Sequence, residues 1–173
     1  AGVAMGQPVM SDVSARIAEN GYQLNGPALT FVANSSDIRA IDPPAGYELE
    51  LGGPELADGL LASDWPHGIG PRPTRPTMFV SLSRNQGKTV GVATINADSD
   101  NAWQIGLDVA PDHRGRKLGA AMTSSLGLAT LAQGKVPYYA SRVENIPSMR
   151  TALSAGFVLT WAVLWGTEAQ GLP

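Results

Sequence analysis

A basic, glycine-containing stretch in the middle of the chain has the composition of an anion-binding loop. Arg114, Arg116 and Lys117 supply positive charge, while Gly115 and Gly119 allow a tight turn and a close approach of the backbone to a ligand. The residues that follow have helical periodicity, and the first N–H groups of a helix lack partners within that helix. The helix dipole adds partial positive charge at the same end. This pattern predicts an anion site, and a phosphate is its natural occupant.

The best-known motifs for phosphate, metal and nucleophile chemistry are absent from the sequence. No G-x-G-x-x-G opens the helix and no G-x-x-x-x-G-K-[ST] occurs, so the Rossmann and P-loop interpretations lack their defining residues. We expect no metal site, because His67 and His113 are the only histidines and the chain has no cysteine. A Ser-His-Asp hydrolase is unsupported because G-x-S-x-G is missing.

A second polar pattern follows the helix and the strand after it. Asn145, Ser148, Gly156 and Phe157 stand in the stretch ENIPSMRTALSAGF. The two stretches together resemble the motifs of the GCN5-related N-acetyltransferases. The first is similar to the acyl-CoA pyrophosphate loop of that family, R/Q-x-x-G-x-G/A, and the second to its later motif, N-x-x-[AS]-x-x-x-x-x-x-x-G-F. Lys117 stands where the loop pattern has its first glycine.

The resemblance covers roughly residues 47–166 and implies both a fold and a cosubstrate. The implied fold is an α/β (α+β) domain in which a mixed, mostly antiparallel twisted sheet is flanked by helices. The implied cosubstrate is acetyl-CoA, with its pyrophosphate on the basic loop and its pantetheine arm where strands 103–109 and 137–141 splay apart. A backbone N–H in residues 107–109 would polarise the thioester carbonyl, and such donors are worth ~3 kcal/mol each. The residues assigned to acetyl-CoA in this way are Leu107, Asp108, Val109, Arg114, Gly115, Arg116, Lys117, Leu118, Gly119, Ala120, Asn145 and Ser148.

The resemblance also implies an amine acceptor that attacks directly, because no cysteine is present to form an acyl-enzyme. An amine with a pKa near ~10 must first lose a proton, so a base or a water chain is needed. The candidate bases are Asp108, Glu144, Asp64 and His67, and the first two fit equally well as surface or helix-terminus charges. His113 is expected to flank the phosphate site rather than to transfer protons.

The usual acid for the leaving group is missing from this chain. Many members of the resembling family carry a tyrosine seven residues after the motif asparagine, and counting from Asn145 places Ala152 there. The nearest hydroxyls on the same helix belong to Ser148 and Thr151. Ser148 is the candidate donor to the departing sulfur, with Asn145 beside it. A helix cap is an equally good interpretation of Ser148.

Residues 62–76, ASDWPHGIGPRPTRP, predict a long loop because they contain four prolines and two glycines. In the resembling family this region lies over the acceptor side, which would make Trp65 and His67 substrate-binding wall residues. Trp65 is explained equally well as the side chain that packs the loop onto the domain.

Hydrophobic periodicity and turn residues predict the remaining elements. The stiff segment 42–46, with Pro43 and Pro44, suggests a boundary between an N-terminal extension, residues 1–45, and an acetyltransferase-like domain, residues 46–173. We expect the extension, a helix plus a strand, to pack on the core. Strands 77–82, 89–95 and 103–109 should form an antiparallel meander. The full set is helices 12–20, 55–61, 118–132 and 145–156, and strands 29–33, 47–51, 77–82, 89–95, 103–109, 137–141 and 157–165.

Composition narrows the classes of partner. The chain has 173 residues, a net charge of −3 and 43% hydrophobic residues, which suits one domain with a sizeable core. The acidic balance argues against nucleic-acid binding. No apolar run approaches the ~20 residues of a membrane helix, and the N-terminus does not have the composition of a secretory signal. We therefore expect a soluble, cytoplasmic protein with no membrane partner. The oligomeric state stays open, a homodimer included.

These observations favour an N-acetyltransferase that passes an acetyl group from acetyl-CoA directly to the amine of a small molecule or peptide. The alternative is a non-catalytic acyl-CoA-binding module of the same fold, suggested by Lys117 at the glycine position and by the lack of an obvious base. A structural or partner-binding domain without CoA is a third hypothesis. The sequence does not identify the acceptor.

Overall fold

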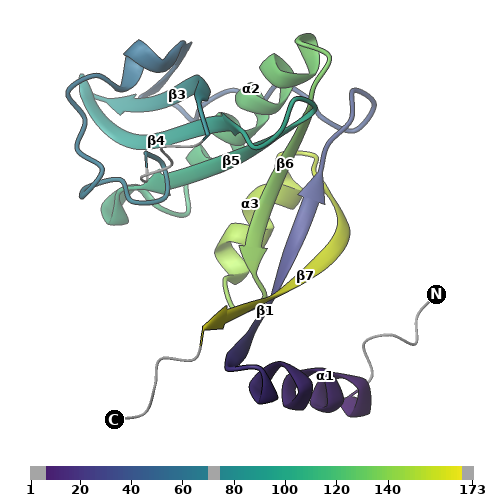
Figure 1. Cartoon of the computed structure of the whole chain (residues 1–173). Helices are drawn as coiled ribbons and strands as arrows, with labels where there is room; N and C mark the ends of the chain where they lie inside the picture. Colours follow the sequence, from purple (N-terminus) through teal and green to yellow (C-terminus); the bar gives the residue numbers. More distant parts are fainter. Residues whose placement is uncertain (1–6, 70–74, 169–173) are drawn as a thin grey trace.

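The computed structural model describes residues 7–69 and 75–168, and the statements below concern these residues. Figure 1 shows a twisted sheet whose two halves diverge, with helices against it. In chain order the elements are α1 (Gln7–Glu19), β1 (Tyr22–Val32), β2 (Tyr47–Gly52), the 3-10 turn η1 (Pro54–Ala57), β3 (Thr77–Asn85), β4 (Lys88–Ala97), β5 (Ala102–Val109), the 3-10 turn η2 (Pro111–His113), α2 (Leu118–Ala132), β6 (Val136–Arg142), α3 (Ile146–Ser154) and β7 (Val158–Glu168).

The sheet has seven strands in the order β2-β3-β4-β5-β6-β1-β7. All neighbouring strands are antiparallel except β5 and β6, which run parallel. A parallel pair needs a crossover, and α2 supplies it between β5 and β6. The predicted fold class, a mixed and mostly antiparallel sheet flanked by helices, is confirmed, as is the meander of β3, β4 and β5.

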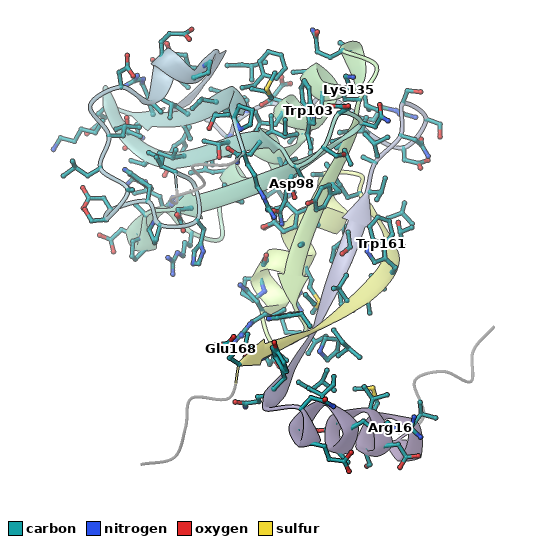
Figure 2. The ribbon with its side chains drawn as sticks, viewed as in Figure 1. Arg16, Asp98, Trp103, Lys135, Trp161 and Glu168 are labelled. Atoms are coloured by element: carbon teal, nitrogen blue, oxygen red, sulfur yellow. The ribbon has the colours of Figure 1, made fainter. Side chains whose placement is uncertain are left out.

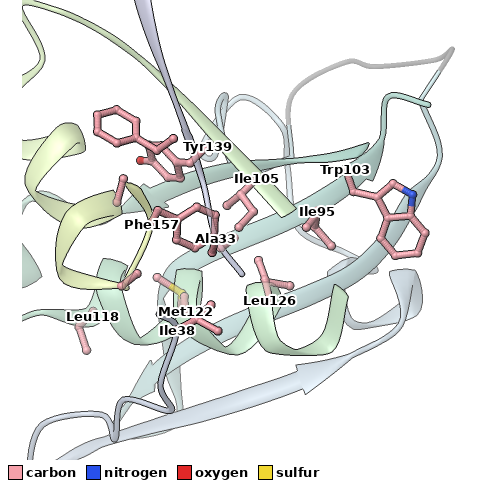
Figure 3. Close-up of a cluster of buried hydrophobic side chains, with 14 of the residues drawn as sticks. Ala33, Ile38, Ile95, Trp103, Ile105, Leu118, Met122, Leu126, Tyr139 and Phe157 are labelled. Carbon is pink, nitrogen blue, oxygen red and sulfur yellow. The ribbon is translucent and has the colours of Figure 1, made fainter. Parts of the chain in front are cut away.

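Helix α2 covers one face of the sheet and forms the main core with it. Leu118, Met122 and Leu126, spaced four residues apart, share one side of the helix and are almost fully buried. They pack in one cluster with Ile105 of β5 and with Phe157, as Figure 3 shows. Because most residues of α2 are apolar or small, the helix lies deep against the strands, and its first turn reaches the end of β5 at Leu107.

A smaller cluster on β3 and β4 holds the long loop against the sheet. Val80, Leu82 and Val92 are buried and pack with Trp65 and Ile69 of the loop. The part of the predicted loop at residues 70–74 lies outside the described residues. The described part keeps irregular structure, as its prolines and glycines predict.

The predicted helix at residues 55–61 is wrong. Only the 3-10 turn η1 forms there, and the chain continues in turns to residue 64. Gly59 has a positive φ of 80°, which breaks the helical backbone after barely a turn. Starting an α-helix is unfavourable, and a segment this short adds too few hydrogen bonds to offset that free energy. The helical spacing of the leucines therefore does not lead to a helix.

The N-terminal segment is longer and more integrated than its sequence pattern suggests. Helix α1 begins at Gln7, and β1 begins at Tyr22 rather than at residue 29. β1 lies between β6 and β7 within the sheet, so the strand of the predicted extension is an inner strand. The outer strand β7 carries Trp161, labelled in Figure 2, which is 48% exposed. Among the helices of the described residues, none has the length and apolarity to cross a membrane.

Candidate functional site

The parallel strands β5 and β6 separate halfway along their length. Their register runs from Ala102 opposite Val136 to Ile105 opposite Tyr139, and pairing ends there. On its other side β5 stays paired with β4 to its last residue, Val109 opposite Gly91. The backbone of β5 after Ile105 therefore faces a fork in the sheet, which Figure 1 shows as the divergence of β5 from β6. This is the splay that the resemblance implied.

A cavity of about 930 Å³ occupies the fork and extends to the start of α2. Four segments form its wall: the end of β5, the loop into α2, the end of β6 and the first turns of α3. A second hollow of about 610 Å³ lies where α1, β1 and β7 meet, but no ionisable side chain lines it. The fork is the better candidate site, because polar and charged groups from several elements converge on it.

The loop into α2 has the backbone geometry of an anion site. Gly115 has a φ of 75°, and Lys117, which precedes the helix, has a φ of 64° and a ψ of 10°. The first helical bond runs from the Ala121 N–H to the Lys117 carbonyl, 3.1 Å away, so the N–H groups before Ala121 have no acceptor within the helix. Lys117 has the left-handed backbone conformation that glycine adopts most easily. This explains why the pattern R/Q-x-x-G-x-G/A has a glycine at the position that Lys117 occupies here.

The predicted loop residues contribute in different ways. Arg114 lines the cavity, and its Nε donates to the carbonyl of Val109 at 2.9 Å, which ties the loop to the end of β5. Lys117 also lines the cavity, whereas Arg116 is exposed and is not part of its wall. A Cβ on Gly119 would lie 3.1 Å from side-chain atoms of Leu107 and Thr151, so this glycine lets α2 approach β5 and α3.

The first turn of α3 brings two predicted residues to the fork. Asn145 is the N-cap, and its Oδ1 accepts the Ser148 N–H at 3.1 Å, as the sequence predicts. The Ser148 hydroxyl is 2.9 Å from the hydroxyl of Tyr139 on β6. Ala152, at the position of the family's usual tyrosine, has 0% exposure and belongs to the core. Thr151 donates its hydroxyl proton to the Pro147 carbonyl at 3.0 Å.

Tyr139 is the site residue that sequence reasoning missed. It lines the cavity at the point where the strands separate and is only 5% exposed. Burial raises its pKa, the hydrogen bond to Ser148 lowers it, and the negative charge of Asp108 raises it further. Residues 137–141 have the sequence PYYAS, and in a strand Tyr138 and Tyr139 must point to opposite faces of the sheet. The sequence alone does not show which of the two tyrosines faces the site.

The long loop contributes His67 to the cavity wall, but Trp65 packs elsewhere. One carboxylate oxygen of Asp108 accepts the backbone N–H groups of His67 at 2.7 Å and of Gly68 at 2.8 Å. The hydroxyl of Thr94 donates to the Gly68 carbonyl at 2.6 Å. Asp108 thus holds the loop on the edge of the fork. Trp65 lies in the small cluster on β3 and β4, which supports its packing interpretation.

The other predicted candidates lie at or beyond the edge of the site. His113 lines the cavity and its Nδ1 is 2.9 Å from the hydroxyl of Tyr47. Glu144 and Asp64 are exposed and take no part in the cavity wall. Within the described residues, no cluster of three or more His, Asp or Glu side chains could hold a metal ion.

No family model and no curated protein sequence matches the chain. Solved structures do match it. A GCN5-related N-acetyltransferase-like protein from Streptococcus suis 89/1591 has a TM-score of 0.61 and 20% sequence identity, with 92% of this chain and 67% of that chain covered. A GCN5-related N-acetyltransferase from Kribbella flavida has a TM-score of 0.68 and 17% identity, covering 89% and 63%. One from Sphaerobacter thermophilus has a TM-score of 0.67 and 14% identity, covering 93% and 57%.

The chain thus spans about two thirds or less of the length of these three proteins. At such identities the likeness concerns the fold. The same fold follows from the order of the elements, the splayed pair β5 and β6 and the basic loop between β5 and α2. The chain has the fold of the GCN5-related N-acetyltransferases, as its two sequence motifs predicted.

Proposed function

We propose that this chain is an acetyl-CoA-dependent N-acetyltransferase that transfers the acetyl group directly to an amine. The observation that carries the proposal is the continuity of one cavity from the left-handed loop at the start of α2 to the fork between β5 and β6. A phosphate-binding helix end and an unpaired strand edge are the two features that an acyl-CoA needs, one for its pyrophosphate and one for its amide-containing arm.

The residues present fit this cosubstrate. The free N–H groups at the start of α2 and the ammonium group of Lys117 would hold the pyrophosphate. The backbone of β5 beyond Ile105, which has no partner in β6, would bond the pantetheine amides and place an N–H near the thioester carbonyl. Acetyl-CoA supplies the activated acyl group, and the chain supplies position, fixed donors and a partly enclosed space.

The acceptor amine would approach from the side of the long loop. On β5, Asp108 alternates with Leu107, so Asp108 faces the loop while Leu107 faces α2 and Gly119. Of the candidate bases, Asp108 and His67 line the cavity, and Asp108 already accepts two backbone N–H groups. We therefore assign His67, or a water next to it, the removal of the amine proton.

A matched pair of charge reversals tests the cosubstrate site. Lys117→Glu and Arg116→Glu change the net charge equally, but only Lys117 lines the cavity. We expect isothermal titration to show acetyl-CoA binding to the wild type, a loss of at least about 10-fold in affinity for Lys117→Glu, and a smaller loss for Arg116→Glu. Equal affinities in all three proteins would refute the loop as the pyrophosphate site.

The second candidate function is a CoA-binding module without turnover, favoured by the absence of the usual tyrosine at Ala152 and by the bonds that already occupy Asp108. Release of free thiol from acetyl-CoA in the presence of a panel of amines separates the two functions. Tight binding without thiol release for any amine would favour the module. Release that depends on one class of amine would establish the transferase and name its acceptor class.

A further inference from the structure

We infer that Tyr139 orients the hydroxyl of Ser148 as a hydrogen-bond donor to the sulfur of the departing CoA, in place of the tyrosine that this chain lacks at Ala152. The inference rests on the proposed function. Ser148 would touch the sulfur, whereas Tyr139 acts through Ser148 and is a positioning residue. Both side chains line the cavity next to the point where β5 and β6 separate.

Thr151 and Ser148, both on α3, differ in whether their hydroxyl protons are available. The hydroxyl of Thr151 donates to the Pro147 carbonyl at 3.0 Å, so its proton is committed to the helix. The Ser148 hydroxyl has its 2.9 Å contact with the Tyr139 hydroxyl instead. If the phenol donates to the Ser148 oxygen, the Ser148 proton is left to point into the cavity.

The chemistry of the two hydroxyl groups favours that direction of the hydrogen bond. A phenol is more acidic than an aliphatic hydroxyl, so Tyr139 is the better donor of the two, and burial, which raises the pKa of the phenol, keeps it protonated. A phenol with a raised pKa is a poor acid toward a thiolate, whose conjugate thiol has a pKa of ~8.5. Tyr139 therefore acts as a lasting donor that polarises Ser148, and not as the source of the proton itself.

The position of the pair is rigid from both sides. Tyr139 is the last residue of β6 in register with β5, and it also pairs with Phe31 of β1. On α3 the Ser148 backbone is held by the Asn145 cap. An oriented hydroxyl at a fixed place needs little reorganisation as negative charge develops on the sulfur, which is the condition for electrostatic stabilisation.

The step balances without a further reagent. The amine nitrogen forms a bond to the acetyl carbon, the carbon–sulfur bond breaks, and its electron pair goes to the sulfur. The proton lost by the nitrogen passes to His67 or water. The Ser148 O–H stabilises the thiolate by a hydrogen bond, and the thiolate takes its proton from water after it leaves.

Bound CoA gives a readout that does not depend on the acceptor. We would measure the pKa of the CoA thiol by ultraviolet absorbance of the thiolate, free and bound to wild type, Ser148→Ala, Tyr139→Phe and the double variant. The wild type should lower the thiol pKa, and each single variant should raise it again by about 0.5 to 1 unit. The double variant should match Ser148→Ala, because Tyr139 acts through Ser148. The other ionisable residues of the cavity wall stay in place in all variants: His67, Asp108, His113, Arg114, Lys117, Arg142 and Arg150.

Tyr138→Phe is the matched control. It makes the same change in the neighbouring residue, whose hydroxyl bonds Asp98 and not Ser148, so the thiol pKa should stay as in wild type. With an acceptor in hand, Tyr139→Phe should lower kcat about 10-fold while the affinity for CoA and the thermal midpoint change little.

The outcomes separate this inference from the proposed function. CoA binding with a thiol pKa unaffected by Tyr139→Phe would overturn the role of Tyr139 and leave the proposed function standing. If Tyr139→Phe shifts the thiol pKa by the same amount whether or not Ser148 is already replaced by alanine, Tyr139 does not act through Ser148, and that part of the inference is overturned. Failure of the wild type to bind CoA would overturn the proposed function and this inference together.

Discussion

Lys117 occupies a backbone conformation that suits glycine, and its side chain is a cation at the start of α2. Its φ of 64° lies in the left-handed region, where a residue with a Cβ is strained. Of the described residues other than glycine, only Gln86 and Lys117 have a positive φ. Strain kept at a cavity wall suggests that the side chain has a use there, and a lysine beside a phosphate is such a use.

Replacing Lys117 by glycine should therefore separate stability from binding. We expect Lys117→Gly to raise the free energy of unfolding by about 0.5 to 1 kcal/mol, since relief of strain outweighs the added freedom of the unfolded chain. Its affinity for acetyl-CoA should fall about 3- to 10-fold with the lost charge. Arg116→Gly, which relieves no left-handed strain, should be destabilised instead. Denaturant unfolding and titration calorimetry check both, and a destabilised Lys117→Gly would contradict the assignment.

The raised pKa of Tyr139 predicts how stability depends on pH. The folded protein holds the phenolic proton more tightly than the unfolded chain does. This contribution is fully present below ~pH 10 and is lost as the pH rises through the raised folded-state pKa. Between pH 9 and 11 (about one unit on either side of the usual tyrosine pKa), wild type should lose more stability than Tyr139→Phe. Parallel stability curves for the two proteins would show that the phenol is not the group responsible.

The long loop and β5 are joined mainly through the carboxylate of Asp108. This side chain accepts the N–H groups of His67 and Gly68, and Thr94 of β4 bonds the Gly68 carbonyl. Gly68 is itself buried, and a Cβ there would lie 2.7 Å from the Val92 carbonyl oxygen. These contacts fix the loop beside the fork, and they hold His67 in the cavity wall.

Weakening this anchor should loosen the loop more than the domain. We expect Asp108→Asn to lower the free energy of unfolding by about 1 to 2 kcal/mol, because a charged acceptor of two N–H groups becomes a neutral one. Limited proteolysis within the loop should speed up, and the KM for the acceptor should rise more than that for acetyl-CoA. Asp64→Asn is the control and should behave as wild type, because Asp64 lies on the same loop but is exposed, and its carboxylate accepts the hydroxyl of the neighbouring Ser63 at 3.3 Å.

The molecule as a whole places its core directly behind the site. Ala152 of α3 has 0% exposure and belongs to the same core cluster as Leu118 of α2, which also lines the cavity. Gly119 lets α2 come within van der Waals distance of Leu107 and Thr151. The core and the cavity wall therefore share residues, and Ala152 has no space around it for a large side chain.

Restoring the family's usual tyrosine should accordingly fail. We expect Ala152→Tyr to lower the free energy of unfolding by about 1 to 3 kcal/mol or more, because the added ring overpacks a closed core. It should not raise the rate of thiol release. Thermal unfolding and the thiol assay measure both, with Leu153→Tyr as the control, because Leu153 lies on the same helix, is exposed and does not line the cavity. A stable Ala152→Tyr with a higher rate would mean that the ring reaches the fork and that Tyr139 is dispensable.

Local patterns in the sequence predict much of this architecture. The alternation in the strand at Trp103, the glycines and cations of residues 114–119 and the Asn145 cap depend on neighbours in sequence, and the structure confirms the meander, the crossover helix and the N-cap. The resemblance of two motifs supplied the fold and the splayed strands, which spacing could not have supplied.

Contacts between distant segments were decided only in three dimensions. The leucines of residues 55–61 suggested a helix, but Gly59 turns the chain and Leu56 and Leu60 pack on β3 and β4 instead. Trp65 packs there rather than at the cavity, and Asp108 bonds the loop. Tyr139 meets Ser148 across the gap from β6 to α3, and β1 enters the sheet beside β6. Each of these contacts depends on which faces of the strands and helices meet after folding. Which faces become buried is determined by the packing of the whole chain and not by neighbouring residues in the sequence.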